Sequence, residues 1–289
     1  MRRTPESPVV RVLPGPVQAA GIAFLLLIAL APIAYVVLAS VSTDLSVAGG
    51  TFLPTAYDLT NYVRIWSTVE LAAGLGNSLV VAGTVAVASS LVALASAYVL
   101  VGYQFRGRLT LLRALLGLQS IPGTLLLLPV FVLFATIANA LSVQIIGTRW
   151  GLFITYLTFA LPFSTWVMVT YLRGLPRELT EAARIDGAST PQILTRVILP
   201  LSWPGMVVAA IFAFLLGWND VLFASVMTDT DTRTVAVALQ VFGATQEGGA
   251  LPVYGQLMAA ALLCAVPVVG LYLIFQRYLV GGLTAGGVK

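Results

Sequence analysis

Long apolar runs separated by short polar segments make up most of the chain. Six stretches of at least 23 residues contain no Asp, Glu, Lys or Arg: 12–43, 71–105, 114–148, 150–172, 197–219 and 248–276. A helix needs about 20 residues to cross the hydrocarbon core of a bilayer, so each stretch is long enough to span it. The alternating strands of an outer-membrane barrel are absent from the sequence. We therefore expect an all-α integral membrane protein with six transmembrane helices, at about 17–41, 76–101, 113–136, 150–172, 203–226 and 254–276.

The polar segments between these spans are too short to bury cores of their own, so residues 1–289 are expected to form a single membrane domain. The longest outer segment, about 42–73, is expected to carry a short amphipathic helix around 59–66. A charged loop at 173–202 joins the fourth and fifth spans. The first apolar run is much longer than the 7–15 residues of a signal-peptide core, which favours a retained anchor over a cleaved signal.

Composition and charge agree with a membrane location. The chain is 59% hydrophobic and 9% charged, whereas an ordinary soluble domain is roughly 25% charged. Basic residues are retained on the cytoplasmic side of a membrane, and an N-terminus inside gives twelve inner basic residues against three outer ones, Arg64, Arg149 and Arg233. The inner ones are Arg2, Arg3, Arg11, Arg106, Arg108, Arg113, Arg173, Arg177, Arg184, Arg196, Arg277 and Lys289. We expect a multi-pass protein of the cytoplasmic membrane with both termini inside, and a net charge of +4 that reflects topology rather than nucleic-acid binding.

The side-chain inventory offers little for catalysis. The chain has no histidine and one cysteine, Cys264, so we expect no disulfide, no metal site and no catalytic residue. A phosphate-binding P-loop needs a lysine after its glycines, and the only lysine is Lys289. Any ATP hydrolysis linked to this chain must therefore take place on another chain.

The 173–202 loop has the pattern of a helix, a glycine turn and a second helix. Glu178 and Glu181 favour the positive N-terminal end of the first helix, and Gly187 can adopt a left-handed C-terminal cap. Thr190, which precedes a proline, is the expected N-cap of the second helix. Small alanines beside charged residues suit close docking against another protein. The alternative, a helix resting on the lipid surface, fits less well because the apolar face is small and the acids are many.

The sequence of this loop, EAARIDGASTPQILTRVILP at 181–200, resembles the EAA loop of ABC importer permeases, with Val197 where isoleucine is usual. The longer form LPRELTEAARIDGAS is similar to permeases of the maltose-transporter, carbohydrate-uptake type. Other pieces match that family in order, over a likeness that runs from about residue 57 to the end: GNSLVVAG (76–83), AYVLVGYQFRGR (97–108), IPGTLLLLPVF (121–131), WGLFITYLTFALPFSTW (150–166), GWND (217–220) and QRYLVGGLTAGGVK (276–289).

The resemblance implies a type I ABC importer permease fold and transport by alternating access. It implies that the loop contains a coupling helix seated in a cleft of a separate ATPase, contacted by Glu181, Ala182, Ala183, Asp186 and Gly187. It also implies that the C-terminal tail reaches toward the ATPase dimer, through Gly282, Leu283, Thr284 and Gly286. The expected partners are that ATPase dimer, which would hold ATP and Mg, a second permease subunit, an extracellular solute-binding protein and membrane lipid. No cofactor is expected on this chain, and the solute is expected to be a sugar or sugar-like compound.

Residues that contact the solute are harder to predict. Asp220 lies near the membrane next to Trp218 and Asn219, and an aromatic face beside hydrogen-bonding groups suits a sugar. The equally open alternative is that Asp220 caps a helix end or bonds a neighbouring helix. A secondary transporter would need several intramembrane acids or repeated halves, and a membrane enzyme would need a cluster of catalytic groups. The sequence offers neither set of features, so an importer subunit is the preferred interpretation, and a stand-alone secondary transporter is kept as the alternative.

Overall fold

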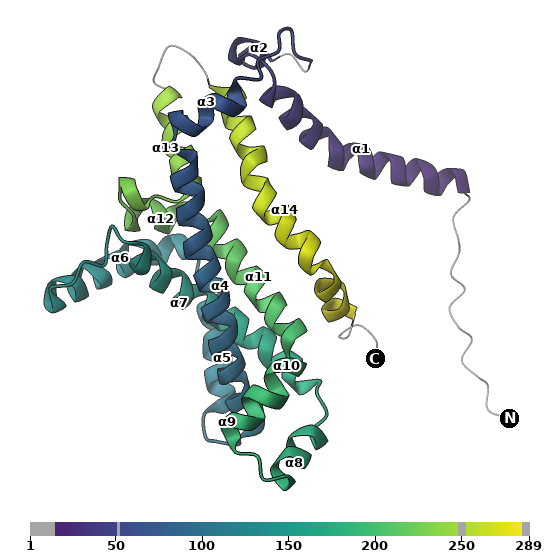
Figure 1. Cartoon of the computed structure of the whole chain (residues 1–289), viewed down its shortest axis with the longest axis vertical. Helices are drawn as coiled ribbons and strands as arrows, with labels where there is room; N and C mark the ends of the chain where they lie inside the picture. The colour runs from purple at the N-terminus through teal and green to yellow at the C-terminus, as the bar shows by residue number, and fades with distance from the viewer. Residues whose placement is uncertain (1–14, 51–52, 248–252, 285–289) are drawn as a thin grey trace.

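The computed structural model describes residues 15–50, 53–247 and 253–284, and these residues are helical with short connections (Figure 1). Within them, the one β feature is an isolated bridge between Ser42 and Tyr57. Among these described residues, five helices are long and apolar enough to cross a membrane, or six if a bent pair of helices counts as one span. The all-α architecture predicted from the sequence is therefore confirmed for the described part of the chain.

The described residues form the α-helices α1 to α14, with one π-helical and one 3₁₀-helical segment between them. In chain order they are α1 (Gly15–Ser40), α2 (Asp44–Ala48), α3 (Asn61–Thr68), α4 (Leu71–Gly102), α5 (Arg108–Leu118), α6 (Gly123–Leu141), α7 (Arg149–Arg173), α8 (Glu178–Ile185), α9 (Thr190–Gln192), the π-helical segment η1 (Ile193–Ile198), α10 (Leu199–Leu201), α11 (Trp203–Asn219), α12 (Leu222–Met227), the 3₁₀ turn η2 (Thr230–Thr232), α13 (Val235–Glu247) and α14 (Tyr254–Thr284).

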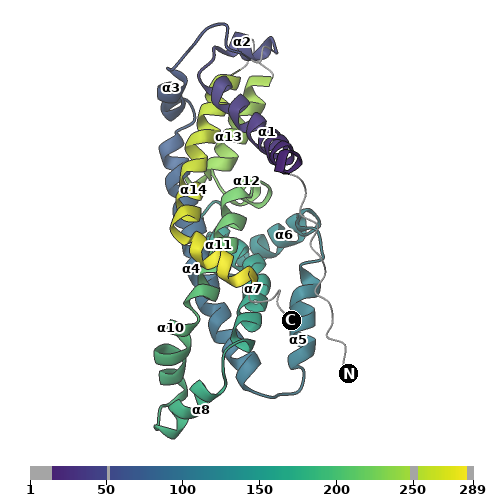
Figure 2. The same cartoon turned by 90° about the vertical axis from the view of Figure 1, so that its right-hand side faces the viewer.

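Helices α4, α7 and α11 pack together as the centre of the molecule, with α14 alongside α11 (Figures 1 and 2). Small residues allow this close approach, as is usual between membrane helices. At Gly217 of α11, an added Cβ atom would lie 3.1 Å from the Tyr156 ring of α7 and 3.4 Å from the Cα atom of Ala82 in α4. The three helices therefore approach closely at this glycine, and a larger residue would require the Tyr156 ring to shift.

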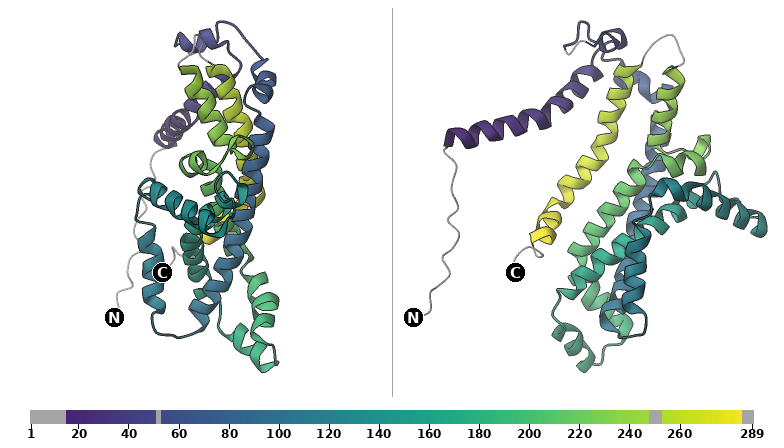
Figure 3. Two further views of the ribbon diagram at one scale, coloured as in Figure 1. Left: turned by 90° about the vertical axis from the view of Figure 1, so that its left-hand side faces the viewer. Right: turned by 180° about the vertical axis from the view of Figure 1, so that it is seen from behind.

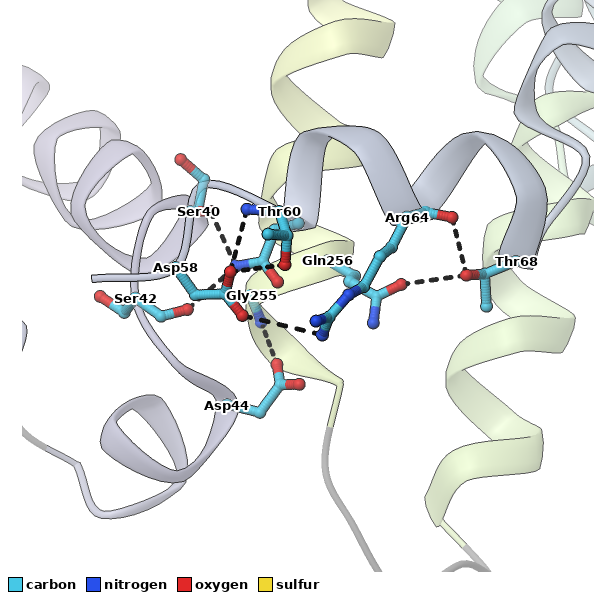
Figure 4. Close-up of polar contacts among 10 residues, drawn as sticks. Ser40, Ser42, Asp44, Asp58, Thr60, Arg64, Thr68, Gly255 and Gln256 are labelled. Atoms are coloured by element: carbon cyan, nitrogen blue, oxygen red, sulfur yellow. Dashed lines mark hydrogen bonds and ion pairs between the residues drawn. The ribbon is translucent and has the colours of Figure 1, made fainter. Parts of the chain in front are cut away.

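One end of the molecule is held by a polar network that joins α1, α2, α3 and α14 (Figure 4). The buried Asn61 side chain donates to the carbonyl oxygens of Ser40, at 3.0 Å, and Ser42, at 2.9 Å. The Asp44 carboxylate accepts a hydrogen bond of 2.8 Å from the Gly255 amide, at the start of α14. Burial raises the pKa of Asp44, partly offset by that hydrogen bond. The helix expected around 59–66 is present here as α3.

The third apolar run differs from the single span expected at 113–136, because it forms two helices. Helix α5 ends at Leu118 and α6 begins at Gly123, directly after Pro122. Proline disfavours helical geometry in the residue before it and is itself suited to a helix start, so the chain breaks there although hydropathy continues. None of the residues of α6 is buried, and the helix projects from the bundle on the side opposite α1 (Figure 3).

The fifth run also differs from its expected bounds of 203–226. Residues 190–201 and 203–219 form two helical pieces that meet at an angle of 78°. Pro204 stands in the first turn of α11, where the missing amide hydrogen costs nothing. Helix α11 ends at Asn219, Asp220 is extended, and α12 follows as a separate helix. Helices α12 and α13 were not predicted, because both are shorter than a membrane span.

Candidate functional site

The 173–202 loop projects beyond the ends of α4, α7 and α11, at the end of the molecule away from α2 and α3 (Figures 1 and 2). Its first helix, α8, begins just after Pro176 and carries Glu178 and Glu181 in the first turn, with Arg184 in the last turn. The acids lie at the positive end of the helix dipole and the arginine lies at its negative end, so both interactions stabilise the helix. This matters because a helix of this length has little stability on its own.

The end of α8 is a complete Schellman turn, as the sequence predicts for Gly187. The Gly187 amide donates to the Arg184 carbonyl at 3.0 Å, and the Ala188 amide donates to the Ala183 carbonyl at 2.9 Å. Gly187 has a φ angle of +81°, and no atom lies within 4 Å of an added Cβ. Glycine is needed at this position for its backbone conformation and not for space.

The second helix of the loop begins one residue earlier than the sequence suggests. Ser189, not Thr190, is the N-cap, and its amide donates to Gln192 Oε1 at 2.8 Å. The prediction of Thr190 was wrong because Gln192, three residues after Ser189, completes a capping box with the serine. The chain then continues as the π-helical segment η1, a form that often occurs at functional sites.

Helix α8 has an inner and an outer face, and the five predicted contact residues divide between them. Ala183 is half-buried and packs, with Ala188, against the core formed by the ends of α4, α7 and α11. Glu181 lines a hollow between α8 and that core. The other three predicted residues, Ala182, Asp186 and Gly187, are exposed.

Ile185 lies on the outer face of α8, and sequence reasoning missed it. Its side chain is 87% exposed, more than any other large apolar side chain that the structure describes. An exposed isoleucine beside Ala182 provides an apolar contact point on an otherwise charged helix. The signal was visible as the single large apolar residue in EAARIDG, but its orientation could not be known without the fold.

The predicted solute residues Trp218, Asn219 and Asp220 lie in different surroundings in the structure. Trp218 is buried in the core and its ring stacks on Phe214, with centroids 5.3 Å apart. Asp220 Oδ2 accepts hydrogen bonds from the Tyr156 hydroxyl at 2.8 Å and from the Ala224 amide at 3.0 Å. Asp220 therefore ties α7 to the start of α12, and only Asn219 is exposed.

The remaining candidates are placed as follows. Gly282, Leu283 and Thr284 belong to the last turns of α14, while Gly286 lies outside the described residues. Among the residues that the structure describes, no group of three or more His, Cys, Asp and Glu side chains is arranged to hold a metal ion.

The sequence matches the family model described as "Binding-protein-dependent transport system inner membrane component" over residues 86–284. The trehalose/maltose transport system permease protein MalG of Thermococcus litoralis is 34% identical over 272 residues, covering 93% of this chain and 95% of the relative. The trehalose transport system permease protein SugB of Mycobacterium tuberculosis is 32% identical over 262 residues, covering 90% and 93%.

A solved structure with a similar fold is that of a bacterial ABC transporter involved in the import of the acidic polysaccharide alginate. One of its chains superimposes with a TM-score of 0.73 at 23% identity, covering 91% of this chain and 95% of that one. At this identity the likeness concerns the fold alone.

Proposed function

The chain belongs to the family of binding-protein-dependent transport system inner membrane components, of the carbohydrate-importer type, and we propose that it couples solute passage to a separate ATPase through its 173–202 loop. As a family member it is a multi-pass membrane component of an importer and not itself an enzyme. The proposed ATPase is a dimer that holds ATP and Mg, and the proposed motion is alternating access.

The observation that carries this proposal is the outer face of α8. Ala182 leaves room for close approach, Ile185 offers apolar area, and Asp186 offers a charge at the tip of the loop. Gly187 fixes the turn that presents them. A cleft on the ATPase that binds this outer face of α8 would pull on the loop when the ATPase dimer closes.

The inner face of the loop supports transmission of that pull. Ala183 and Ala188 are packed against a cluster of buried side chains that includes Leu172 of α7 and Ile193 of η1. The Tyr171 hydroxyl donates to the Leu201 carbonyl at 3.1 Å, and the Tyr171 ring lies where a side chain on Gly205 would clash, 2.6 Å from an added Cβ. A displacement of α8 would therefore move α7 and α11 together. In this proposal, Glu181 acts at the edge of the loop and Ala183 holds it to the bundle.

The remaining partners are proposed from the family to which the chain belongs. A second permease subunit and lipid would cover the apolar faces of α1 and α6, which are largely exposed. A solute-binding protein would approach the end formed by α2 and α3, and the C-terminal segment 282–286 would extend toward the ATPase. Both termini are proposed to be cytoplasmic, with six spans if the bent pair around Ser202 counts as one.

The solute is proposed to be a saccharide, because the relatives are named for trehalose and maltose transport. Asn219 remains a candidate for contacting it. Trp218 and Asp220 are assigned to holding α11 and α12 in place, since their partners lie within the chain.

The test is a mild-detergent isolation of the tagged chain from its own membrane, with the co-purifying proteins identified by mass spectrometry. The proposal expects an ATP-binding cassette ATPase and a second permease, with a solute-binding protein when solute is added. A second tagged importer from the same membrane serves as the control that complexes survive. If that control retains its ATPase while this chain is isolated alone, the proposal fails and a stand-alone secondary transporter becomes the better account.

A further inference from the structure

A hollow of about 220 Å³ lies on the inner side of α8, between that helix and the ends of α4 and α7. Three arginines line it: Arg108 at the start of α5, Arg177 just before α8, and Arg184 on α8 itself. Glu181 is the one acid in the lining, so the wall carries three positive charges and one negative, a formal +2.

These charges are not neutralised within the described part of the chain. Among the described residues, the one ion pair joins Arg64 to Asp58, at the opposite end of the molecule. The side chain of Arg108 has a single long hydrogen bond, 3.4 Å to the Tyr103 carbonyl. Guanidinium groups gathered around a recess without carboxylate partners are the arrangement that binds phosphate, because they present several fixed donors to one anion.

Tyr98 provides a second, independent observation. It lines the same hollow and is 6% exposed, yet its hydroxyl has no hydrogen-bond partner in the described structure. Buried polar groups without partners are rare, and each calls for an explanation. Because that hydroxyl is itself buried, a ligand oxygen in the hollow would pair with it after a turn of the Tyr98 side chain, whereas the side chains of Gln104 and Thr180 in the lining could bind ligand oxygens directly.

We infer that this hollow binds a phosphate group, which links Arg108 of α5 to Arg177 and Arg184 of the 173–202 loop. The phosphate can belong to the headgroup of an anionic phospholipid or to a soluble phosphate compound. Basic recesses between helix ends on the cytoplasmic side are a known setting for such headgroups. Binding of the phosphate does not depend on the proposed function. Its consequence does rest on that function: the bound phosphate would hold α8 in the position in which it contacts the ATPase.

The experiment uses the purified full-length chain without the ATPase, so that its outcome does not depend on the proposed function. Native mass spectrometry compares retention of phosphatidylglycerol with that of phosphatidylcholine, and thermal melting in detergent with and without inorganic phosphate tests the soluble source. The test variant is Arg108→Gln with Arg177→Gln. The matched control is Arg106→Gln with Arg173→Gln, two exposed arginines of the same end that do not line the hollow.

The expected result is preferential retention of phosphatidylglycerol or stabilisation by phosphate, weakened at least about tenfold in the test variant, since two charge-assisted hydrogen bonds are lost. The control should bind as the unaltered chain does. Tyr98→Phe, which keeps the ring, should weaken binding by a smaller factor. Retention of the lipid alone identifies a headgroup, and stabilisation by phosphate without lipid identifies a soluble anion. Binding of neither, or equal loss in the test and control variants, would overturn the inference.

Discussion

Replacing Ile185 by alanine is expected to weaken binding of the ATPase by roughly 10- to 50-fold while leaving the permease folded. The side chain is 87% exposed, so it contributes little to internal packing. Burying a methylene group is worth about 0.8 kcal/mol, and the change removes three carbons, which gives about 2.4 kcal/mol if docking buries them all. At about 1.4 kcal/mol for each factor of ten, the upper limit is about 50-fold. Incomplete burial gives the lower figure.

The assay is a titration of the ATPase onto the chain held in lipid nanodiscs. Ile185→Val, which removes one carbon, should weaken binding only about fourfold. Ile28→Ala on α1 is the control, because Ile28 is also exposed, at 54%, but lies far from α8. All variants should melt at the temperature of the unaltered chain. Unaltered ATPase affinity for Ile185→Ala, or an equal loss for Ile28→Ala, would refute the assignment of the outer face of α8.

Three further predictions concern the parts of the fold that support this loop. Gly205→Ala places a Cβ atom 2.6 Å from the ring of Tyr171, so it should lower the free energy of unfolding by about 1–3 kcal/mol. Denaturant unfolding of the double variant with Tyr171→Ala should show a loss smaller than the sum of the two single losses. Tyr156→Phe removes the 2.8 Å hydrogen bond to Asp220 and should cost about 1.5–3 kcal/mol; fully additive effects with Asp220→Ala would contradict this contact. Burial raises the pKa of Asp44 above its ordinary 3.8, so the folded state binds the carboxyl proton more tightly than the unfolded state does. The free energy of unfolding should therefore fall as pH rises above about 4, and Asp44→Asn should flatten the plot of melting temperature against pH in that range.

Much of the fold could be predicted from the sequence because apolar runs bounded by charge leave a chain few options in a membrane. Hydropathy could not show where the helix in an apolar run is interrupted. The third run is continuous in character, and only Pro122 marks the point where α5 ends and α6 turns away. Helices α12 and α13 escaped prediction because each is shorter than a span and depends on tertiary contacts, α12 with α6 and α7, and α13 with α4 and α14.

The site shows the same division between local and tertiary information. The left-handed turn at Gly187 was predictable because the need for φ > 0 is local. The orientation of α8 was not, so Ile185 was not identified, and the packing of half-buried Ala183, a predicted ATPase contact, against the chain's own core was not foreseen. For Asp220 the sequence left two interpretations open, a solute contact and a bond to a neighbouring helix, and it could not identify the partner Tyr156, which is 64 positions away.

The most direct test of the account is the uptake of solute per ATP hydrolysed in proteoliposomes that contain the chain, its ATPase and its partner permease. With Gly187→Val, the strained left-handed backbone should displace the face carrying Ala182 and Ile185, at a cost of about 1–2 kcal/mol. The complex is expected to assemble and hydrolyse ATP, but uptake per ATP should fall well below that of the unaltered chain. Uptake that proceeds without ATP, or an unchanged ratio in the Gly187→Val variant, would contradict coupling through this loop.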